Sequence, residues 1–277
     1  MSIDNNTSNY LTPEQYDELF EAIQGYTLIV LKSITDNSTS VRDVIIRNFI
    51  AKGLTCSRSI LHIWKLGDYD NCWSIFRIML DRLFHLQSLC DKNEFEVFEK
   101  WSFIQQYKAR QDARSDPELR KKVHSSRVSF SPDEKRRYSQ LVKENINWVR
   151  PKAETVAKSQ DLSFLYKYGY DYASTLVHPM ATDGASDFEQ LSKGIITIPR
   201  ESLGVLQNAM LAQLLLIQKG LNASDLQWQP IMYDFLDHCL SALKSYNQKY
   251  RFTFAKIAGM RAGVQWCEPR NLKPNRT

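Results

Sequence analysis

Long stretches of this sequence space their apolar residues at helical intervals, and few glycines or prolines interrupt them. The 277 residues include only 10 glycines and 9 prolines, which disfavours a turn-rich β-sandwich or barrel. The segments beginning at Thr12 and Ser131 each combine a capping hydroxyl, a proline at the next position and a Gln or Glu three residues after the cap. This arrangement starts helices, so the sequence predicts an all-α fold.

We expect a single helical bundle of about seven to nine helices. The apolar spacing and the stop signals predict helices over about residues 13–35, 40–66, 72–90, 92–112, 132–149, 162–177, 200–220 and 224–250, with a short helix after Pro151. The bundle is expected to span residues 1–250. It includes a basic helical excursion at about 105–140 and a loop at about 180–198 with one short extended piece, and a basic C-terminal tail follows at 251–277.

The cysteines and the apolar stretches indicate where the protein resides. The five cysteines are widely spaced with no CxxC pair, so neither a disulfide framework nor a zinc knuckle is expected; they are Cys56, Cys72, Cys90, Cys239 and Cys267. Residues 1–10 are polar and predict no secretory signal. The longest apolar stretch, at about 209–217, is too short to cross a bilayer. We therefore expect a cytoplasmic protein with reduced thiols and no membrane partner.

Positive charge is concentrated in two parts of the chain. Residues 100–150 contain 13 Lys or Arg and 6 Asp or Glu, a net charge of +7, and residues 251–277 carry +5. Clustered cations favour phosphate binding through counterion release, so RNA or another nucleic acid is an expected partner. The candidate nucleic-acid-binding residues are Lys108, Arg110, Arg114, Arg120, Lys121, Lys122, Arg127, Lys135, Arg136 and Arg137.

Three aromatic residues lie among these cations and could stack on bases: Tyr107, Phe130 and Tyr138. The alternative is that the cations cover surface helices and pair with nearby carboxylates. The chain has no helix-turn-helix, RNA-recognition or zinc-finger signature that would decide between the two.

A polar stripe crosses the predicted helix at 72–90, which has apolar residues around much of its circumference. Arg77, Asp81 and His85 follow one another at intervals of four residues, so they share one side of the helix. An Arg in such a helix needs a partner, and Asp81 is placed to supply one. The stripe is therefore either a structural ion pair with His85 beside it or an active or ligand-binding site.

A second group of polar residues follows at the end of the predicted helix at 162–177. Tyr172, Ser174 and His178 precede Pro179, and Ser174 and His178 share one helix face. A serine nucleophile would need an oxyanion loop, which the sequence lacks. Otherwise Ser174 permits close helix contact and His178 closes the helix C-terminus.

Arg58 and His62 form a third candidate, because an Arg–His pair can serve metal-independent ribonucleases. The helical HEPN nucleases have four to six residues between the Arg and the His, whereas three intervene here, so the likeness is distant. No metal-ligand spacing occurs around His178 or His238, and no glycine-rich phosphate loop is present. We expect neither a metal nor a cofactor.

The stripe from Arg77 to Asp81, followed by the Tyr-x-Ser-x-x-x-His-Pro segment at 172–179, resembles an uncharacterised all-helical bacterial family of unknown function. The likeness covers roughly residues 40–220, and the acid in that family is usually Glu rather than Asp. The resemblance implies that the two motifs face one another in one polar pocket. It implies no known reaction, although some helical families of this kind accompany toxin and phage-defence systems.

Two functional hypotheses follow from these features. The first is a nucleic-acid-directed protein, namely a metal-independent endoribonuclease of bacterial defence or toxin type, whose catalytic residues would come from Arg77, Asp81, His85, Tyr172, Ser174 and His178. The second is a non-catalytic interaction module with a structural polar network and a basic excursion that docks an acidic protein partner. The apolar helices over 200–250 either complete the bundle or form the face of a homo-oligomer.

Overall fold

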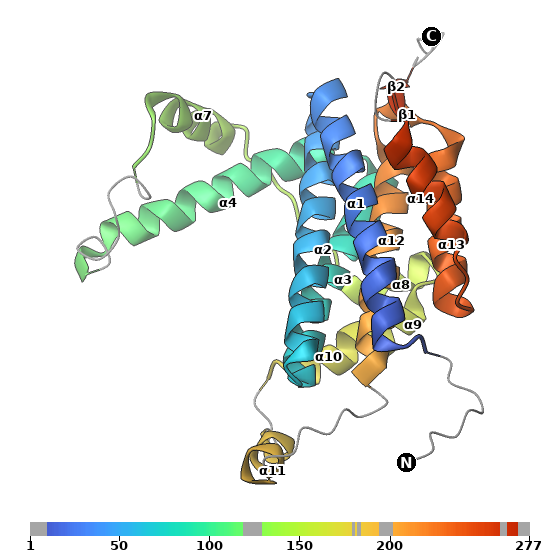
Figure 1. Cartoon of the computed structure of the whole chain (residues 1–277). Coiled ribbons are helices and arrows are strands. Elements are labelled where there is room, and N and C mark those ends of the chain that lie inside the picture. Colours follow the sequence, from blue (N-terminus) through green and yellow to red (C-terminus); the bar gives the residue numbers. More distant parts are fainter. Residues whose placement is uncertain are drawn as a thin grey trace, which may run out of the picture. The chain divides into compact units, whose positions relative to one another are not determined.

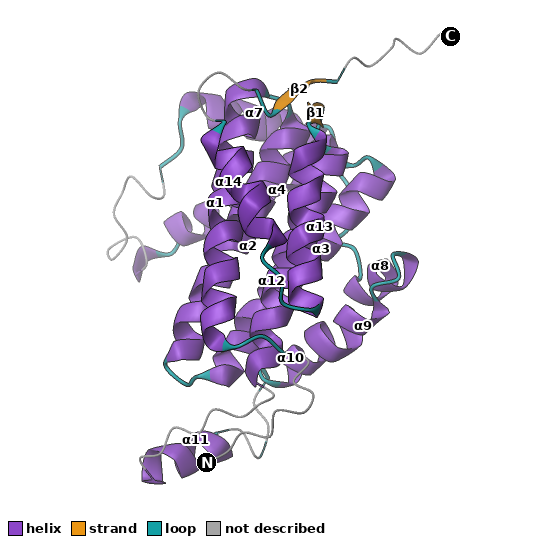
Figure 2. Ribbon diagram, turned by 45° about the vertical axis from the view of Figure 1, so that its right-hand side comes forward, coloured by secondary structure: helices purple, strands orange, loops and turns teal. Residues whose placement is uncertain are grey.

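The computed structural model describes residues 10–118, 129–178, 181, 184–193, 202–260 and 265–270. Figure 2 shows that the described chain is almost entirely helical, which confirms the predicted all-α class. The chain divides into two compact units, which we call the main unit (residues 1–88 and 151–277) and the hairpin unit (residues 89–150). No helix in the described part of the chain is both long enough and apolar enough to cross a membrane.

The main unit is built on long helices that run side by side (Figure 1). The elements in it are α1 (Pro13–Asn37), α2 (Val41–Lys65), α3 (Tyr69–Lys92, whose last residues fall in the hairpin unit), α8 (Ala153–Ser159), α9 (Ser163–Leu165), the π-helix η1 (Tyr166–Asp171), α10 (Tyr172–Thr175), α11 (Ala185–Lys193), α12 (Ser202–Ala223), β1 (Leu226–Trp228), α13 (Pro230–Lys244), α14 (Lys249–Gly259) and β2 (Cys267–Pro269). The hairpin unit contains α4 (Phe95–Ser115) and α7 (Pro132–Lys143).

The predicted helix starts are present. Thr12 and Ser131 each accept a hydrogen bond from the backbone N–H three residues later, and the Gln or Glu at that position accepts one in return. These reciprocal bonds satisfy two donors that a helix start would otherwise leave without partners. The capping chemistry read from the sequence therefore fixes the first residues of α1 and α7.

Helices α2 and α12 form the centre of the main unit because glycines let them approach closely. A Cβ atom on Gly53 of α2 would overlap Oε1 of Gln213, and one on Gly220 of α12 would lie 2.7 Å from Cδ1 of Ile50. Both separations are too short for real atoms, so a side chain at either position would force its neighbour to move. The two glycines thereby set the distance between the central helices.

The C-terminal part of the main unit differs from its prediction. The sequence predicts one helix over 224–250 and then a tail, whereas the structure has β1, α13 and α14 in succession. β1 pairs antiparallel with β2, with Leu226 opposite Pro269 and Trp228 opposite Cys267. The partner strand lies some 40 residues further along the chain, so local helical spacing could not reveal this pairing.

The predicted loop at 180–198 also contains a helix, because residues 185–193 form α11. The extended piece predicted at 195–198 lies outside the described residues. A short amphipathic helix with small and polar residues around it gives a weak sequence signal, which explains the difference.

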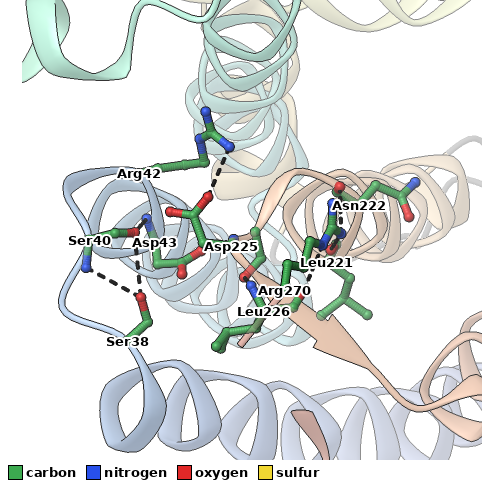
Figure 3. A network of polar contacts seen from close by, with 10 residues as sticks. Ser38, Ser40, Arg42, Asp43, Leu221, Asn222, Asp225, Leu226 and Arg270 are labelled. Atoms are coloured by element: carbon green, nitrogen blue, oxygen red, sulfur yellow. Dashed lines mark hydrogen bonds and ion pairs between the residues drawn. The ribbon is translucent and has the colours of Figure 1, made fainter. Parts of the chain in front are cut away.

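A polar network fastens the strand pair to the ends of α1, α2 and α12 (Figure 3). Asp43 is fully buried, and its Oδ1 accepts a hydrogen bond from the backbone N–H of Asp225 at 3.1 Å. Arg42 forms an ion pair with the Asp225 carboxylate at 3.0 Å. Arg270 donates to the backbone carbonyls of Leu221 and Asn222, which are among the last carbonyls of α12 and have no helical partner of their own.

In the hairpin unit an aromatic stack joins α4 to α7. Tyr107 is buried, with Phe130 stacked on it at 4.0 Å between ring centroids and Tyr138 stacked on it at 4.0 Å. Its ring is therefore occupied by two neighbours from the same unit. The prediction that Tyr107 could stack on a base is wrong, because this ring is a core residue of the hairpin unit.

Candidate functional site

A cavity of about 470 Å³ lies beside the first half of α3 in the main unit. It brings together two residues of the predicted stripe, Arg77 and Asp81, with polar residues from the start of the same helix and one residue that follows α10. The lining residues are Ile63, Asp68, Asn71, Ser74, Ile75, Arg77, Ile78, Asp81 and Val177. The cavity is therefore part apolar, with one cation and two carboxylates around it.

Arg77 does not form the ion pair that its spacing from Asp81 predicts. In the described part of the chain, no carboxylate lies within ion-pair distance of Arg77, and no cationic group lies within ion-pair distance of Asp81. The Arg77 guanidinium instead lies over the ring of Tyr170, 4.9 Å from its centroid. One terminal nitrogen donates a long hydrogen bond of 3.4 Å to the Tyr170 hydroxyl, so the aromatic ring takes the position that a carboxylate would otherwise hold.

The Nε atom of Arg77 is buried and has no hydrogen-bond partner. A buried donor without a partner costs free energy that an equivalent paired donor does not. The guanidinium therefore has donor capacity left over and lines an open cavity. That combination is typical of a group that binds an anion.

The π-helix η1 explains how Tyr170 reaches Arg77. Leu165, Gly169 and Ala173 are buried at intervals of four residues along α9, η1 and α10. A Cβ atom on Gly169 would lie 2.9 Å from Cε1 of Phe76 and 3.0 Å from Cδ1 of Leu80, so this segment packs tightly on α3. The wider turn of the π-helix keeps a spacing of four residues aligned on one side.

Tyr170 is a site residue that the sequence analysis missed. The sequence carries a signal in retrospect, because four tyrosines alternate with other residues around Gly169 over 166–172. A strict α-helix would spread these tyrosines around its axis. Residues four apart share a side, which pairs Tyr166 with Tyr170, and the two rings are stacked.

The other predicted catalytic residues lie near the cavity but do not line it. Tyr172 packs edge-on against Trp73 at 5.3 Å between centroids, and the Ser174 hydroxyl donates to the carbonyl of Tyr170 at 2.7 Å. His178 is exposed and directly follows Val177. His85 is half-buried, further along α3. The structure thus brings Arg77 and Asp81 to one cavity and leaves the other four around it.

The Arg58–His62 pair lies on α2, and both side chains are exposed. Neither residue lines the cavity. The pair therefore has no part in the site beside α3.

Many of the predicted nucleic-acid-binding cations have partners within the hairpin unit. Arg110 pairs with Glu134 at 2.6 Å, Arg137 with Glu99 at 2.5 Å, and Arg136 with Asp133 at 2.8 Å. The predicted cations that are exposed and form no ion pair with a described residue are Lys108, Arg114 and Lys135. The remaining predicted cations lie outside the described residues: Arg120, Lys121, Lys122 and Arg127.

Four of the five cysteines are poorly suited to act as nucleophiles. Burial raises the pKa of Cys72, which lies on α3 near the cavity, to about 12. Burial also raises the pKa of Cys56 and Cys239, and that of Cys267 to about 11. These thiols stay protonated at neutral pH and act as core residues.

Metal ligands do not gather in the part of the chain that the structure describes, where no three His, Cys, Asp or Glu side chains could hold one ion. His238, one of the residues considered for a metal, shares a 2.8 Å hydrogen bond with the hydroxyl of Thr253.

The chain was compared with models of known protein families. A model for a family of unknown function, DUF5677, matches residues 43–195. The chain belongs to the DUF5677 family. The DUF5677 match contains α3, η1, α10 and all of α2 except its first two residues, and it includes every residue that lines the cavity. It confirms the resemblance to an all-helical family of unknown function that the two motifs predicted, whereas the HEPN likeness stays a prediction.

No curated protein and no solved structure matches the chain. For this DUF5677 member the arguments about function therefore depend on the site itself.

Proposed function

We propose that this protein binds single-stranded RNA, with one nucleotide unit in the cavity beside α3. The observation that carries the proposal is Arg77, a cation that lines the cavity, has no carboxylate partner among the described residues and keeps a buried Nε donor unpaired. Asp81, one helical turn away, lines the same cavity. A ligand that presents a phosphate next to a hydroxyl would satisfy both groups, and the ribose-phosphate unit of RNA is such a ligand.

We further propose that the bound RNA is cleaved without a metal ion. Asp81 would take the proton of the 2′-hydroxyl, and the 2′-oxygen would attack the adjacent phosphorus as the bond from phosphorus to the 5′-oxygen breaks. Arg77 would stabilise the charge that develops on the phosphoryl oxygens. His178, next to Val177 at the cavity, would donate a proton to the departing 5′-oxygen. The products would be a 2′,3′-cyclic phosphate and a 5′-hydroxyl end.

Binding and cleavage of labelled single-stranded RNA, at several salt concentrations and with a chelator present, test the proposal. We expect Arg77→Met to weaken binding about tenfold and to reduce the slope of log affinity against log salt by about one. We expect Asp81→Asn and His178→Ala to retain binding and to lose cleavage. RNA with a 2′-deoxy substitution at each position should bind without being cleaved.

Arg58→Met is the matched control, since it removes an exposed arginine of the same unit that lies away from the cavity. It should bind and cleave like the wild-type protein. If Arg58→Met lost activity and Arg77→Met did not, the site would lie on α2 and the proposal would be wrong. A wild-type protein that does not bind RNA at low salt would also contradict it.

A non-catalytic interaction module is the second candidate function. The observation that favours it is the set of exposed cations without a described ion-pair partner on α4 and α7, namely Lys108, Arg114 and Lys135. An acidic peptide would complement them. If this candidate is right, polyglutamate should bind in a salt-dependent way, and a variant with all three residues changed to Ala should lose that binding.

A further inference from the structure

Three aromatic side chains are exposed in a row along α9, η1 and α10. Phe164 is 65% exposed, Tyr168 56% and Tyr172 48%. We call these three residues the aromatic strip. Large aromatic rings in solvent gain nothing from the core of the main unit, so a row of them on one helical face points to a binding partner.

The strip is ordered by the same helical geometry that packs the segment on α3. Its members are four residues apart, as are the buried residues Leu165 and Gly169 that directly follow two of them in the sequence. The rings of Phe164 and Tyr168 lie 4.9 Å apart, and Lys167 places its ammonium group 5.6 Å from the centroid of the Tyr168 ring. The strip therefore presents its rings at a regular interval of four residues along the segment.

The strip leads to the cavity. Tyr172, its last member, packs against Trp73 of α3, and Trp73 precedes the cavity residues Ser74 and Arg77. Val177, five residues beyond Tyr172, also lines the cavity. A chain bound with one phosphate at Arg77 would pass from the cavity directly onto exposed rings.

We propose that the aromatic strip stacks the bases of the RNA whose phosphate lies at Arg77. This inference rests on the proposed function and adds a subsite to it. Stacking on aromatic rings accepts any base, because every base has a π face. Asp161, Lys167 and Asp171 are all exposed within this short stretch of sequence, so its net charge offers little attraction to a phosphate and stacking supplies the affinity. The strip thus makes a contact of a different kind from Arg77.

Binding of a labelled oligouridine to the full-length protein tests this inference, with an oligomer of the same length that carries abasic sites as the comparison. Phe164→Ala, Tyr168→Ala and Tyr172→Ala should each weaken binding of the oligouridine about tenfold. The salt slope should not change, because no cation is removed. The abasic oligomer should bind the wild-type protein and the three variants equally.

Two further variants separate stacking from damage to the fold. Tyr172→Phe keeps the ring and should bind like the wild-type protein. Phe252→Ala removes a ring that is 80% exposed on α14, outside the strip, and should also leave affinity unchanged. A tenfold loss in either variant would overturn the assignment of the affinity to stacking on this strip.

The outcomes distinguish this inference from the proposed function. If Arg77→Met weakens binding and lowers the salt slope while all strip variants bind like the wild-type protein, the subsite is wrong and the RNA-binding cavity stands. If the wild-type protein does not bind RNA, both fail. If the strip variants leave RNA affinity unchanged and convert a dimer to a monomer in sedimentation, the strip is an interface between copies of this chain and the inference is overturned.

Discussion

Arg110 of the hairpin unit and Arg77 of the main unit both lie against aromatic rings, yet only one of them has a carboxylate partner. Arg110 lies over Phe130 and pairs with Glu134 at 2.6 Å. Arg77 lies over Tyr170 and has no ion pair with any described residue. Three of the ten predicted nucleic-acid-binding cations form ion pairs within the hairpin unit, namely Arg110, Arg136 and Arg137. Arg77 of the main unit instead keeps a buried donor unpaired. The residue count alone therefore does not show which cations of this chain have ion-pair partners and which keep an unpaired donor.

The largest expected effect is a loss of stability in the hairpin unit that leaves the main unit unchanged. Tyr107→Ala should destabilise the hairpin unit by about 3–5 kcal/mol, because it removes the middle ring of the three-ring stack and leaves a cavity. Hydrogen exchange should rise in α4 and α7, and α12 should keep the protection of the wild-type protein. Equal loss of protection in α12 would show that the two units unfold as one.

A smaller effect is expected where η1 meets α3. Gly169→Ala should lower the unfolding free energy of the main unit by about 1–3 kcal/mol, because its Cβ would overlap Phe76 and Leu80. Urea unfolding measures the change. Gly259→Ala is the matched control, since no atom lies within 4 Å of its Cβ position, and it should stabilise α14 by up to about 1 kcal/mol. A neutral Gly169→Ala would mean that η1 does not hold Tyr170 tightly against α3.

Features that depend on neighbouring residues were predicted from the sequence. The capping segments at Thr12 and Ser131 and the apolar spacing of α1 to α4 depend on neighbouring residues, so the sequence predicted these helices within a few residues. The i, i+4 placement of Arg77 and Asp81 was likewise local and correct. What those side chains contact depends on η1, which lies more than 80 residues further along the chain.

The features that the sequence analysis missed depend on contacts between residues that are far apart in the sequence. The pairing of β1 with β2, the Tyr170 ring over Arg77 and the use of Tyr107 as a core residue all depend on segments distant in sequence or on burial. Residue counts gave the net charge of 100–150 but not the ion pairs within it. Two residues that line the cavity, Arg77 and Asp81, were therefore among those predicted, whereas the contact of Arg77 with Tyr170 was not.

A pair of matched substitutions tests the comparison of the two arginines directly. Arg77→Met should change the unfolding free energy by less than about 1 kcal/mol, because the lost contact with Tyr170 is offset by removal of a buried donor without a partner. Arg110→Met should lower the stability of the hairpin unit by about 0.5 kcal/mol, as expected for a partly exposed ion pair.

RNA affinity should respond in the opposite order. Arg77→Met should weaken binding and Arg110→Met should leave it unchanged, which fluorescence anisotropy on the same preparations can measure. If Arg110→Met lost more RNA affinity than Arg77→Met, the phosphate would bind in the hairpin unit and not at Arg77.

The smallest expected effect is the response of the hairpin unit to acid. The pKa of Glu134 lies below its usual value of 4.5, because its carboxylate accepts the backbone N–H of Ser131 and a hydrogen bond from Arg110. Lys100 and Gln140 likewise hold the pKa of Glu144 down. A carboxyl group with a lowered folded-state pKa contributes its full stability above the unfolded-state pKa and loses it as the pH falls through the folded-state value. Protection of α7 should therefore decline as the pH falls below about 4.5.

Glu134→Gln isolates this contribution. Glutamine can still accept the N–H of Ser131 in the capping box but carries no charge to attract Arg110. The variant should start with slightly lower protection of α7 at pH 7 and should lose less of it on acidification than the wild-type protein. If wild-type and variant lost protection in parallel, the Arg110–Glu134 pair would contribute nothing to the hairpin unit. Arg110 would then be as available to an anionic ligand as Arg77, and the difference between the two regions would rest on the buried Nε alone.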